Sequence, residues 1–180
     1  IAGIGSGHAT NEDNYVFQRL MREVLGTKNL DVLSHKKEGD DDSFLIRAEK
    51  SPNLYGAQTV GVRPEEGGLD LKGIVRGIGE GTIKALYVLE EDVASIPGIK
   101  SYLTNLDLLV VHSSVRNATT ELADVVLSSS TYAEKQGTFV NFQGRVQRIR
   151  PAVATIEQDR ALDGFSMSRW DKFAAHNDRW

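Results

Sequence analysis

The most informative absence in this chain of 180 residues is cysteine, of which there is none. Without a thiol, the segment forms no disulfide, offers no thiolate nucleophile and ligates no iron–sulfur cluster through its own cysteines. Long apolar runs are also absent, because none approaches the roughly 20 residues needed to cross a bilayer. Ile1 falls within a strand-like pattern with no charged region before it, so we expect no targeting signal and no membrane insertion.

Positive charge is neither abundant nor clustered. Lys and Arg total 21 against 25 Asp and Glu, for a net charge of -4 and a pI near 5.6. Surfaces that bind nucleic acid usually gather basic residues into one patch or stripe, so nucleic acid is not an expected partner. With 40% hydrophobic and 26% charged residues, the chain can build one α/β domain, or a core with a peripheral segment.

Spacings typical of metal and catalytic sites are missing too. No two histidines form the His-x-x-x-His pair of zinc sites; they are His8, His35, His112 and His176. Serines 128–130 follow a strand pattern but lack the Gly-x-Ser-x-Gly geometry of a nucleophile elbow. Acidic residues 40–42 lack the spacing of an EF-hand. We expect no metal site and no catalytic residue.

The first part of the chain shows a strand, a helix and a second strand, at residues 1–6, 10–25 and 29–33. Thr10 and Asp13 are suited to cap the helix, and Gly26 is suited to end it. The apolar face of this helix is expected at Val16, Leu20 and Val24.

Residues 34–68 break this periodicity and predict a long connection with little regular structure. After it, helices are expected at 69–78 and 99–106, a helical turn at 117–123, and strands at 83–89, 107–112 and 124–127. Residues 138–141 and 145–149 predict a hairpin or extended arm. A polar tail follows, carrying Trp170, Phe173 and Trp180, either a docking face or a cover for the domain's own core.

This order predicts an α/β fold: a Rossmann-like, mostly parallel sheet with helices on both faces, plus a C-terminal extended arm and polar tail. We divide the chain into a β-α-β start that is truncated at its N-terminus, a connecting loop, the remainder of the domain and the tail, at 1–33, 34–68, 69–151 and 152–180. In such sheets, ligands bind beyond the carboxyl ends of the strands.

A glycine-rich run between the first strand and the first helix could cradle a phosphate through its backbone N–H groups. It spans Gly3 to Gly7. His8, however, stands where a dinucleotide fingerprint has glycine or alanine, and Asp31 is only a loose candidate for the ribose-binding acid. We favour an ordinary tight turn and keep nucleotide binding as an alternative.

The segment ELADVVLSSSTYAEKQGTFVNFQGRVQRIRP, residues 121–151, combines a buried strand, a polar exit, a charged pair and a second strand. It resembles the C-terminal half of the molybdopterin oxidoreductase superfamily, whose Glu-Lys-x-Gly-Thr-x-x-Asn-x-x-Gly-Arg pattern is matched by Glu134, Lys135, Gly137, Thr138, Asn141 and Arg145. In this superfamily, the sequence is most similar to the large iron–sulfur subunit of respiratory NADH:quinone oxidoreductase, complex I.

The resemblance implies that those six residues lie near the pterin in relatives that bind one, and they are the candidate cofactor-binding residues here. We favour a structural role for them. In that interpretation, Glu134 and Lys135 form a salt bridge, Gly137 takes a positive φ angle, and Asn141 satisfies backbone groups in a bend.

The chain departs from the pattern of the family's molybdenum enzymes in two places. Glu90, Glu91 and Asp92 follow a strand where those enzymes resemble Gly-x-Asn-Pro; each carboxylate would repel a phosphate by roughly 1 kcal/mol at 4 Å in water. We expect a solvated acidic edge there, although paired carboxylates could also hold a hard cation or act as acid and base. Ser113 and Ala118 replace the acid and the glutamate of the guanine-recognition segment, and Asn117 to Thr119 is expected to cap a helix.

The resemblance to complex I implies a cofactor-free domain with a structural or assembly role in an electron-transfer complex. Iron–sulfur clusters would lie in the missing N-terminal part of the same polypeptide, which would be a partner together with the other subunits. The complex would hold the domain on the cytoplasmic side of the bacterial membrane. Two alternatives remain open: a fragment of an enzyme that uses molybdopterin guanine dinucleotide, such as a formate dehydrogenase, and a nucleotide-binding Rossmann module.

Overall fold

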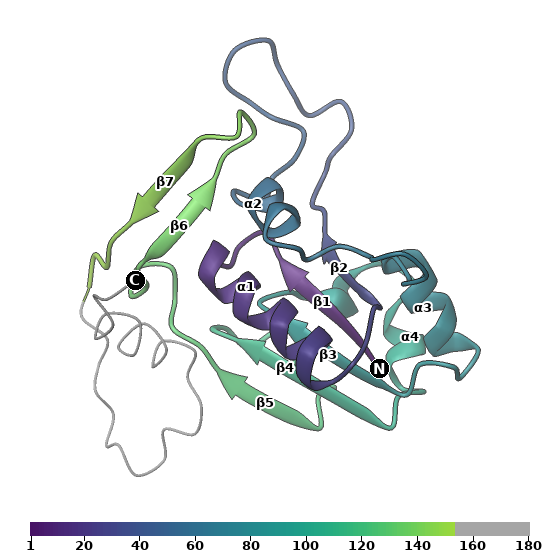
Figure 1. Cartoon of the computed structure of the whole chain (residues 1–180). Coiled ribbons are helices and arrows are strands. Elements are labelled where there is room, and N and C mark those ends of the chain that lie inside the picture. The colour runs from purple at the N-terminus through teal and green to yellow at the C-terminus, as the bar shows by residue number, and fades with distance from the viewer. Residues whose placement is uncertain (154–180) are drawn as a thin grey trace.

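The centre of the fold is a five-stranded sheet with the strand order β2-β1-β3-β4-β5, as seen in the computed structural model, which describes residues 1–153 (Figure 1). All four strand pairings are parallel, which confirms the predicted Rossmann-like sheet. The strands are β1 Ala2–Ser6, β2 Leu30–Leu33, β3 Ala85–Leu89, β4 Leu108–Ser113 and β5 Val125–Ser128.

The strand order creates a topological switch point between β1 and β3. From β1 the chain adds β2 on one side, then returns to add β3, β4 and β5 on the other side. Because the strands are parallel, their carboxyl ends share one edge, and the loops after β1 and β3 diverge there. Ligands of open α/β sheets bind at such an edge.

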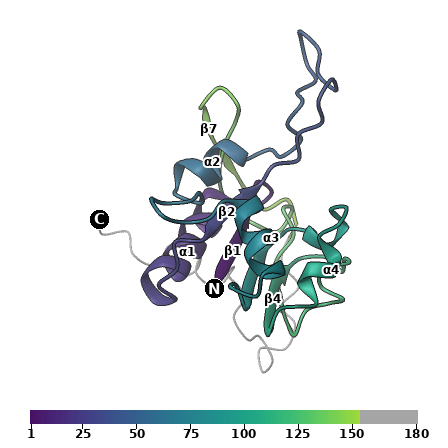
Figure 2. The same ribbon diagram turned by 90° about the vertical axis from the view of Figure 1, so that its right-hand side faces the viewer.

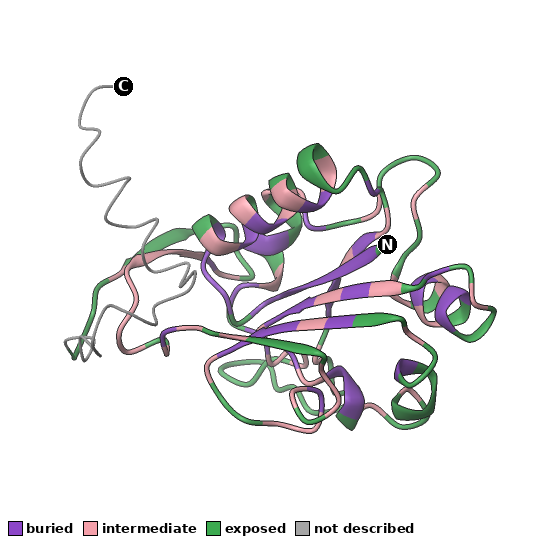
Figure 3. Ribbon diagram, turned by 90° about the horizontal axis from the view of Figure 1, so that it is seen from below, coloured by how far each residue is buried: buried purple, intermediate pink, exposed green. Residues whose placement is uncertain are grey.

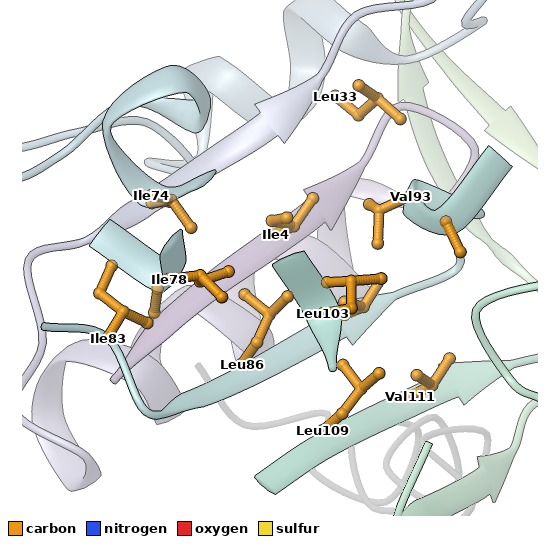
Figure 4. Packing of buried hydrophobic residues seen from close by; sticks show 13 residues of the cluster. Ile4, Leu33, Ile74, Ile78, Ile83, Leu86, Val93, Leu103, Leu109 and Val111 are labelled. Carbon is orange, nitrogen blue, oxygen red and sulfur yellow. The ribbon is translucent and has the colours of Figure 1, made fainter. Parts of the chain in front are cut away.

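Helices cover both faces of the sheet (Figure 3). On one face lie α1 Asn11–Arg19, its continuation η1 Leu20–Val24, and α2 Leu54–Thr59, around buried Phe17 and Met21. On the other lie α3 Leu71–Gly79, η2 Val93–Ser95 and α4 Lys100–Leu103. The residues of that second core are drawn in Figure 4 and include Ile4, Leu33, Ile74, Ile78, Ile83, Leu86, Val93, Leu103, Leu109 and Val111.

The first helix begins as predicted but buries a different face. Thr10 and Asp13 form the expected capping box, with reciprocal backbone bonds of 3.0 and 3.2 Å, and Gly26 follows the helix with a φ of 65°. The predicted apolar face is wrong, because Val24 is 73% exposed. The helix instead buries Asn14, Phe17 and Met21, and its change to a π-helix at Leu20 shifts the later side chains around the axis.

One further segment differs from the prediction, and two agree with it. The connection 34–68 contains α2, six residues whose Gly56 and Ala57 are buried; a helix this short carries too little periodicity to detect, and tertiary packing stabilises it. Residues 118–122 form consecutive turns, in which the N–H of Glu121 donates to the carbonyl of Asn117 as in a turn of helix, and this agrees with the predicted helical turn. The predicted hairpin is present, as β6 Gly137–Val140 paired antiparallel with β7 Val146–Ile149.

One stretch of the long connection projects from the domain (Figure 2). A bridge between Lys36 and Glu49 marks its base, and Phe44 near its tip is 85% exposed. The tail with Trp170, Phe173 and Trp180 lies outside the described residues. No helix within residues 1–153 is long and apolar enough to span a membrane.

Glycine in β1 permits close packing between the sheet and the α1 layer. Gly3 and Gly5 lie inside the strand, not in a phosphate-binding turn, so that part of the glycine-turn interpretation is wrong. A Cβ on Gly5 would lie 2.6 Å from Cγ1 of Val62 and 3.0 Å from Oδ1 of Asn14. These glycines therefore serve the core.

We expect Gly5→Ala to lower the free energy of unfolding by about 1–3 kcal/mol, because the added methyl group overpacks the core. In a Val62→Ala background, which removes the closest contact, the same change should cost less than half as much. Urea unfolding of the two single variants and the double variant measures this coupling. Equal costs in both backgrounds would contradict the packing explanation.

Candidate functional site

Polar and charged side chains gather at the carboxyl edge of the sheet, where the turns after the strands meet α1 and the chain leading into β6. The loop after β3 contributes the acidic triplet, and Lys135 reaches the same place from the segment before β6. A small cavity of about 90 Å³ lies here, lined by His8, Thr10, Glu90, Ser114, Ser130, Tyr132, Lys135, Phe139 and Ile149.

Glu90 directly follows β3, has an unusual backbone conformation and points its carboxylate into this network. Its φ is 50°, a left-handed value that is costly for a residue with a Cβ and is often found at functional positions. Its N–H donates to the carbonyl of His112 at 2.7 Å. The carboxylate accepts from the Ser114 hydroxyl at 2.9 Å, from the Ser129 hydroxyl and from Lys135 at 3.3 Å.

Lys135 is the buried cation that links three parts of the fold. Its side chain is 11% exposed, and Nζ lies 3.3 Å from Glu90 Oε1 and 3.4 Å from Asp13 Oδ2. Burial by itself lowers the pKa of Lys135, but the two carboxylates outweigh burial and raise that pKa above its usual value. The predicted Glu134–Lys135 salt bridge is therefore wrong: Glu134 instead accepts from the N–H and hydroxyl of Thr131.

Glu91 is the most buried member of the acidic triplet. It is 3% exposed, accepts from the Ser6 hydroxyl at 2.7 Å and lies 2.7 Å from Nε2 of His35. Burial raises the pKa of Glu91, and the bonds from Ser6 and His35 oppose that rise.

Asp92 is also engaged inside the protein. It accepts from the Thr119 hydroxyl at 2.7 Å and from the Thr119 N–H at 3.0 Å. Partial burial favours a higher pKa, but hydrogen bonds from Ser95 and Thr119 outweigh it and lower the pKa of Asp92. Asn117 caps the turn beside it by accepting from the N–H groups of Thr119 and Thr120. The predicted solvated acidic edge is thus wrong, because the fold supplies donors to each carboxylate.

The hairpin docks onto the start of α1 through the residues of the family pattern. Thr138 donates through its N–H and its hydroxyl to Glu12, at 2.8 and 2.9 Å. Gly137 has the expected positive φ, of 158°, and a Cβ there would lie 2.7 Å from Glu12 Oε2. Close approach therefore requires glycine at this position.

Buried Asn53 binds the hairpin at Val140, two residues after Thr138. Its Oδ1 accepts from the N–H of Val140 at 2.7 Å, and its Nδ2 donates to the carbonyl of Ala9 at 2.9 Å. Its own N–H donates to Gly7 at 2.8 Å. Asn53 therefore ties α2, the turn after β1 and β6 together, a role that the sequence reading missed because the residue lies in the long connection.

The remaining candidate residues of the pattern stay within the hairpin. Asn141 accepts from the N–H groups of Gln143 and Arg145 at 3.0 and 2.9 Å, which confirms its predicted role in the bend. Arg145 is exposed. The structure thus brings Lys135, Gly137 and Thr138 to the sheet edge and α1, while Glu134, Asn141 and Arg145 have local surroundings.

The acid proposed for nucleotide binding lies elsewhere. Asp31 pairs in register with Ile4, in the first half of β2, and its carboxylate accepts from the N–H groups of Val32 and Leu71. It therefore supports the start of α3 on the other side of the sheet from the turn at Gly7. The geometry does not favour the nucleotide-binding alternative.

Three residues that are distant in sequence meet at the same edge. The side chains of His8, His35 and Glu91 place their candidate ligand atoms within 4.8 Å of one another. The spacing of histidines along the chain could not reveal this group, because each member follows a different strand. The signal that could have predicted the group is the position of its members relative to the strands. Each lies two residues after the last residue of β1, β2 or β3.

Comparison with known proteins gives a consistent result. The sequence model of the family described as molybdopterin oxidoreductase matches residues 50–161. The alpha subunit of an NADPH-Fe(3+) oxidoreductase from Geobacter sulfurreducens is 44% identical over 95 residues, which cover 51% of this chain and 11% of that protein.

Two formate dehydrogenases are also similar. A putative formate dehydrogenase of Bacillus subtilis is 35% identical over 120 residues, covering 64% of this chain and 12% of that protein. The alpha subunit of an F420-dependent formate dehydrogenase from Methanocaldococcus jannaschii is 47% identical over 75 residues, covering 39% of this chain and 11% of that protein. The matched part of the chain spans only about a ninth of the length of these relatives.

We expect Asn53→Ala to destabilise the fold by about 1–3 kcal/mol, because it leaves the buried N–H of Val140 without an acceptor. The Val140 amide should also lose protection from hydrogen exchange. Gln58→Ala, at an exposed position of the same helix, is the matched control and should change stability by no more than about 0.5 kcal/mol. Retained protection at Val140 in Asn53→Ala would contradict the assigned role.

Proposed function

The chain belongs to the molybdopterin oxidoreductase family, and from this premise we propose that it is a cofactor-free structural domain of a larger electron-transfer subunit. The type of subunit we propose is the large iron–sulfur subunit of NADH:quinone oxidoreductase. In this proposal the domain carries out no chemistry. It packs against the rest of its polypeptide and against neighbouring subunits.

The observation that carries the proposal is the occupation of the sheet edge by carboxylates that the fold itself neutralises. Lys135, a cation that could attract a cofactor phosphate, already lies between Asp13 and Glu90. A phosphate brought to this edge would approach the Glu90 carboxylate and compete with it for Lys135. Such repulsion strengthens where water is excluded.

The space at the edge gives further support. The cavity beside Glu90 and Lys135 measures about 90 Å³, whereas pockets for small molecules and cofactors usually measure roughly 300–1,000 Å³. A cavity of this size within residues 1–153 cannot by itself hold a pterin dinucleotide, which supports the cofactor-free proposal, and we assign no step to a pterin.

The segment 113–119, which resembles the guanine-recognition region of the family, also supports a domain without a pterin dinucleotide. Ser113 stands where the family's acid is expected, and its hydroxyl bonds locally with Val115, donating to the carbonyl at 2.9 Å. Ala118 stands where the family has glutamate and offers no side-chain acceptor. Neither position supplies a carboxylate for guanine.

The proposed partners follow from the place of the domain in a longer subunit. The relatives from Geobacter and Methanocaldococcus are themselves named as alpha subunits. Because this chain has no cysteine, we place any iron–sulfur clusters in another part of the same polypeptide. The proposed location is the cytoplasmic side of a bacterial membrane, reached through the complex.

A second candidate is a fragment of a formate dehydrogenase that binds molybdopterin guanine dinucleotide. The identity of 35–47% to two formate dehydrogenases favours it. In that case the other domains of the subunit would have to supply the metal ligand and nearly all contacts to the cofactor, because this edge is acidic.

To test the proposal, the full-length parent protein is purified without chelators and analysed for molybdenum, tungsten, iron and released pterin. We expect iron without stoichiometric pterin, molybdenum or tungsten, together with electron transfer from NADH but not from formate. A pterin-containing formate dehydrogenase taken through the same preparation controls for loss of cofactor. One pterin dinucleotide per subunit, with formate oxidation, would overturn the proposal in favour of the second candidate.

A further inference from the structure

We propose that His8, His35 and Glu91 form a binding site for a divalent transition-metal ion of the zinc class, at the carboxyl edge of β2, β1 and β3. Their candidate ligand atoms lie within 4.8 Å of one another. Nε2 of His35 is 2.7 Å from Oε2 of Glu91, and the rings of His8 and His35 have centroids 5.2 Å apart at an interplanar angle of 62°. This inference does not depend on the proposed function.

The topology of the sheet brings the three residues together. β2, β1 and β3 are adjacent and parallel, so they end at the same edge. Each ligand lies two residues after the last residue of its strand. Ser6 and Leu33, which precede the two histidines by two residues, are paired in register. The equal offsets therefore place both histidines just beyond the paired ends of two neighbouring strands.

Surrounding hydrogen bonds orient these groups. The Ser6 hydroxyl donates to Oε1 of Glu91 at 2.7 Å, which leaves Oε2 directed toward His35. The same hydroxyl accepts from the N–H of His8 at 2.9 Å. The N–H of His35 donates to Glu49 at 3.0 Å. Metal ligands in proteins are commonly held by outer partners of this kind.

The chemistry of the donors selects the kind of ion. Two imidazole nitrogens and one carboxylate oxygen are a ligand set that zinc accepts, with a fourth position left for water. His8 is exposed, so solvent reaches that position. Glu91 is buried and supplies the ligand on the protein side of the site. Calcium and magnesium prefer oxygen ligands throughout. The ion would take the place of the hydrogen bond between His35 and Glu91.

The test is a zinc titration of the metal-free 180-residue chain against a chromophoric chelator, repeated with magnesium and with calcium. We expect one equivalent of Zn²⁺ per chain and no saturable binding of Mg²⁺ or Ca²⁺. His8→Gln should weaken zinc binding by at least about 10–100-fold, the range seen even for outer-partner mutations. Because His8 is exposed, this variant should fold normally, which circular dichroism verifies. Glu91→Gln should weaken binding similarly.

Two control variants isolate the site. Asp107→Asn removes an exposed carboxylate that precedes β4, at the opposite edge of the sheet, and His176→Gln removes a histidine from the C-terminal part of the sequence. Both should bind zinc like the unaltered chain. The proposal is overturned if the chain binds no zinc, if His8→Gln and Glu91→Gln bind it unchanged, or if His176→Gln abolishes binding.

Discussion

The arrangement of the sheet edge depends on one buried cation. Lys135 lies between Asp13, in the first turn of α1, and Glu90, directly after β3, with its side chain 11% exposed. Removing one member of such a group leaves a buried charge uncompensated, which usually costs several kcal/mol. The contact joins the helix layer, the switch point of the sheet and the chain that enters the hairpin. Thr138 and Val140 then extend that attachment to Glu12 and Asn53.

The contacts of Lys135 with Asp13 and Glu90 also explain why we propose a structural role for the domain. Glu90 can occupy the edge because Lys135 and the neighbouring serines neutralise and solvate its carboxylate from within the protein. Because paired side chains of the protein already occupy this edge of the sheet, it is better suited to contact with other parts of the subunit than to binding a phosphate. Glu91, one residue further on, faces the other side of the switch point, where His35 and Ser6 bind it. Adjacent carboxylates thus have separate surroundings and separate roles.

The sequence predicted what local patterns and family motifs encode. Short apolar runs identified the strands of the sheet, Thr10 and Asp13 identified the helix start, and the motif around Gly137 identified the family. Contacts between residues that are far apart in the sequence were not predicted. Lys135 was paired with its neighbour Glu134 because spacing along the chain was the available guide, whereas the fold brings Asp13 and Glu90 to it. The burial of Glu91 escaped for the same reason, since its partners Ser6 and His35 follow other strands.

The most direct test of the account is a double-mutant cycle between Glu90 and Lys135, using Glu90→Gln, Lys135→Met and the double variant in chemical unfolding. We predict a coupling free energy of about 1–3 kcal/mol between the two side chains. The exposed pair of Lys84 and Asp107, 3.9 Å apart, serves as a control and should couple by about 1 kcal/mol at most. Additive effects at Glu90 and Lys135, within about 0.5 kcal/mol, would contradict the claim that this ion pair organises the edge.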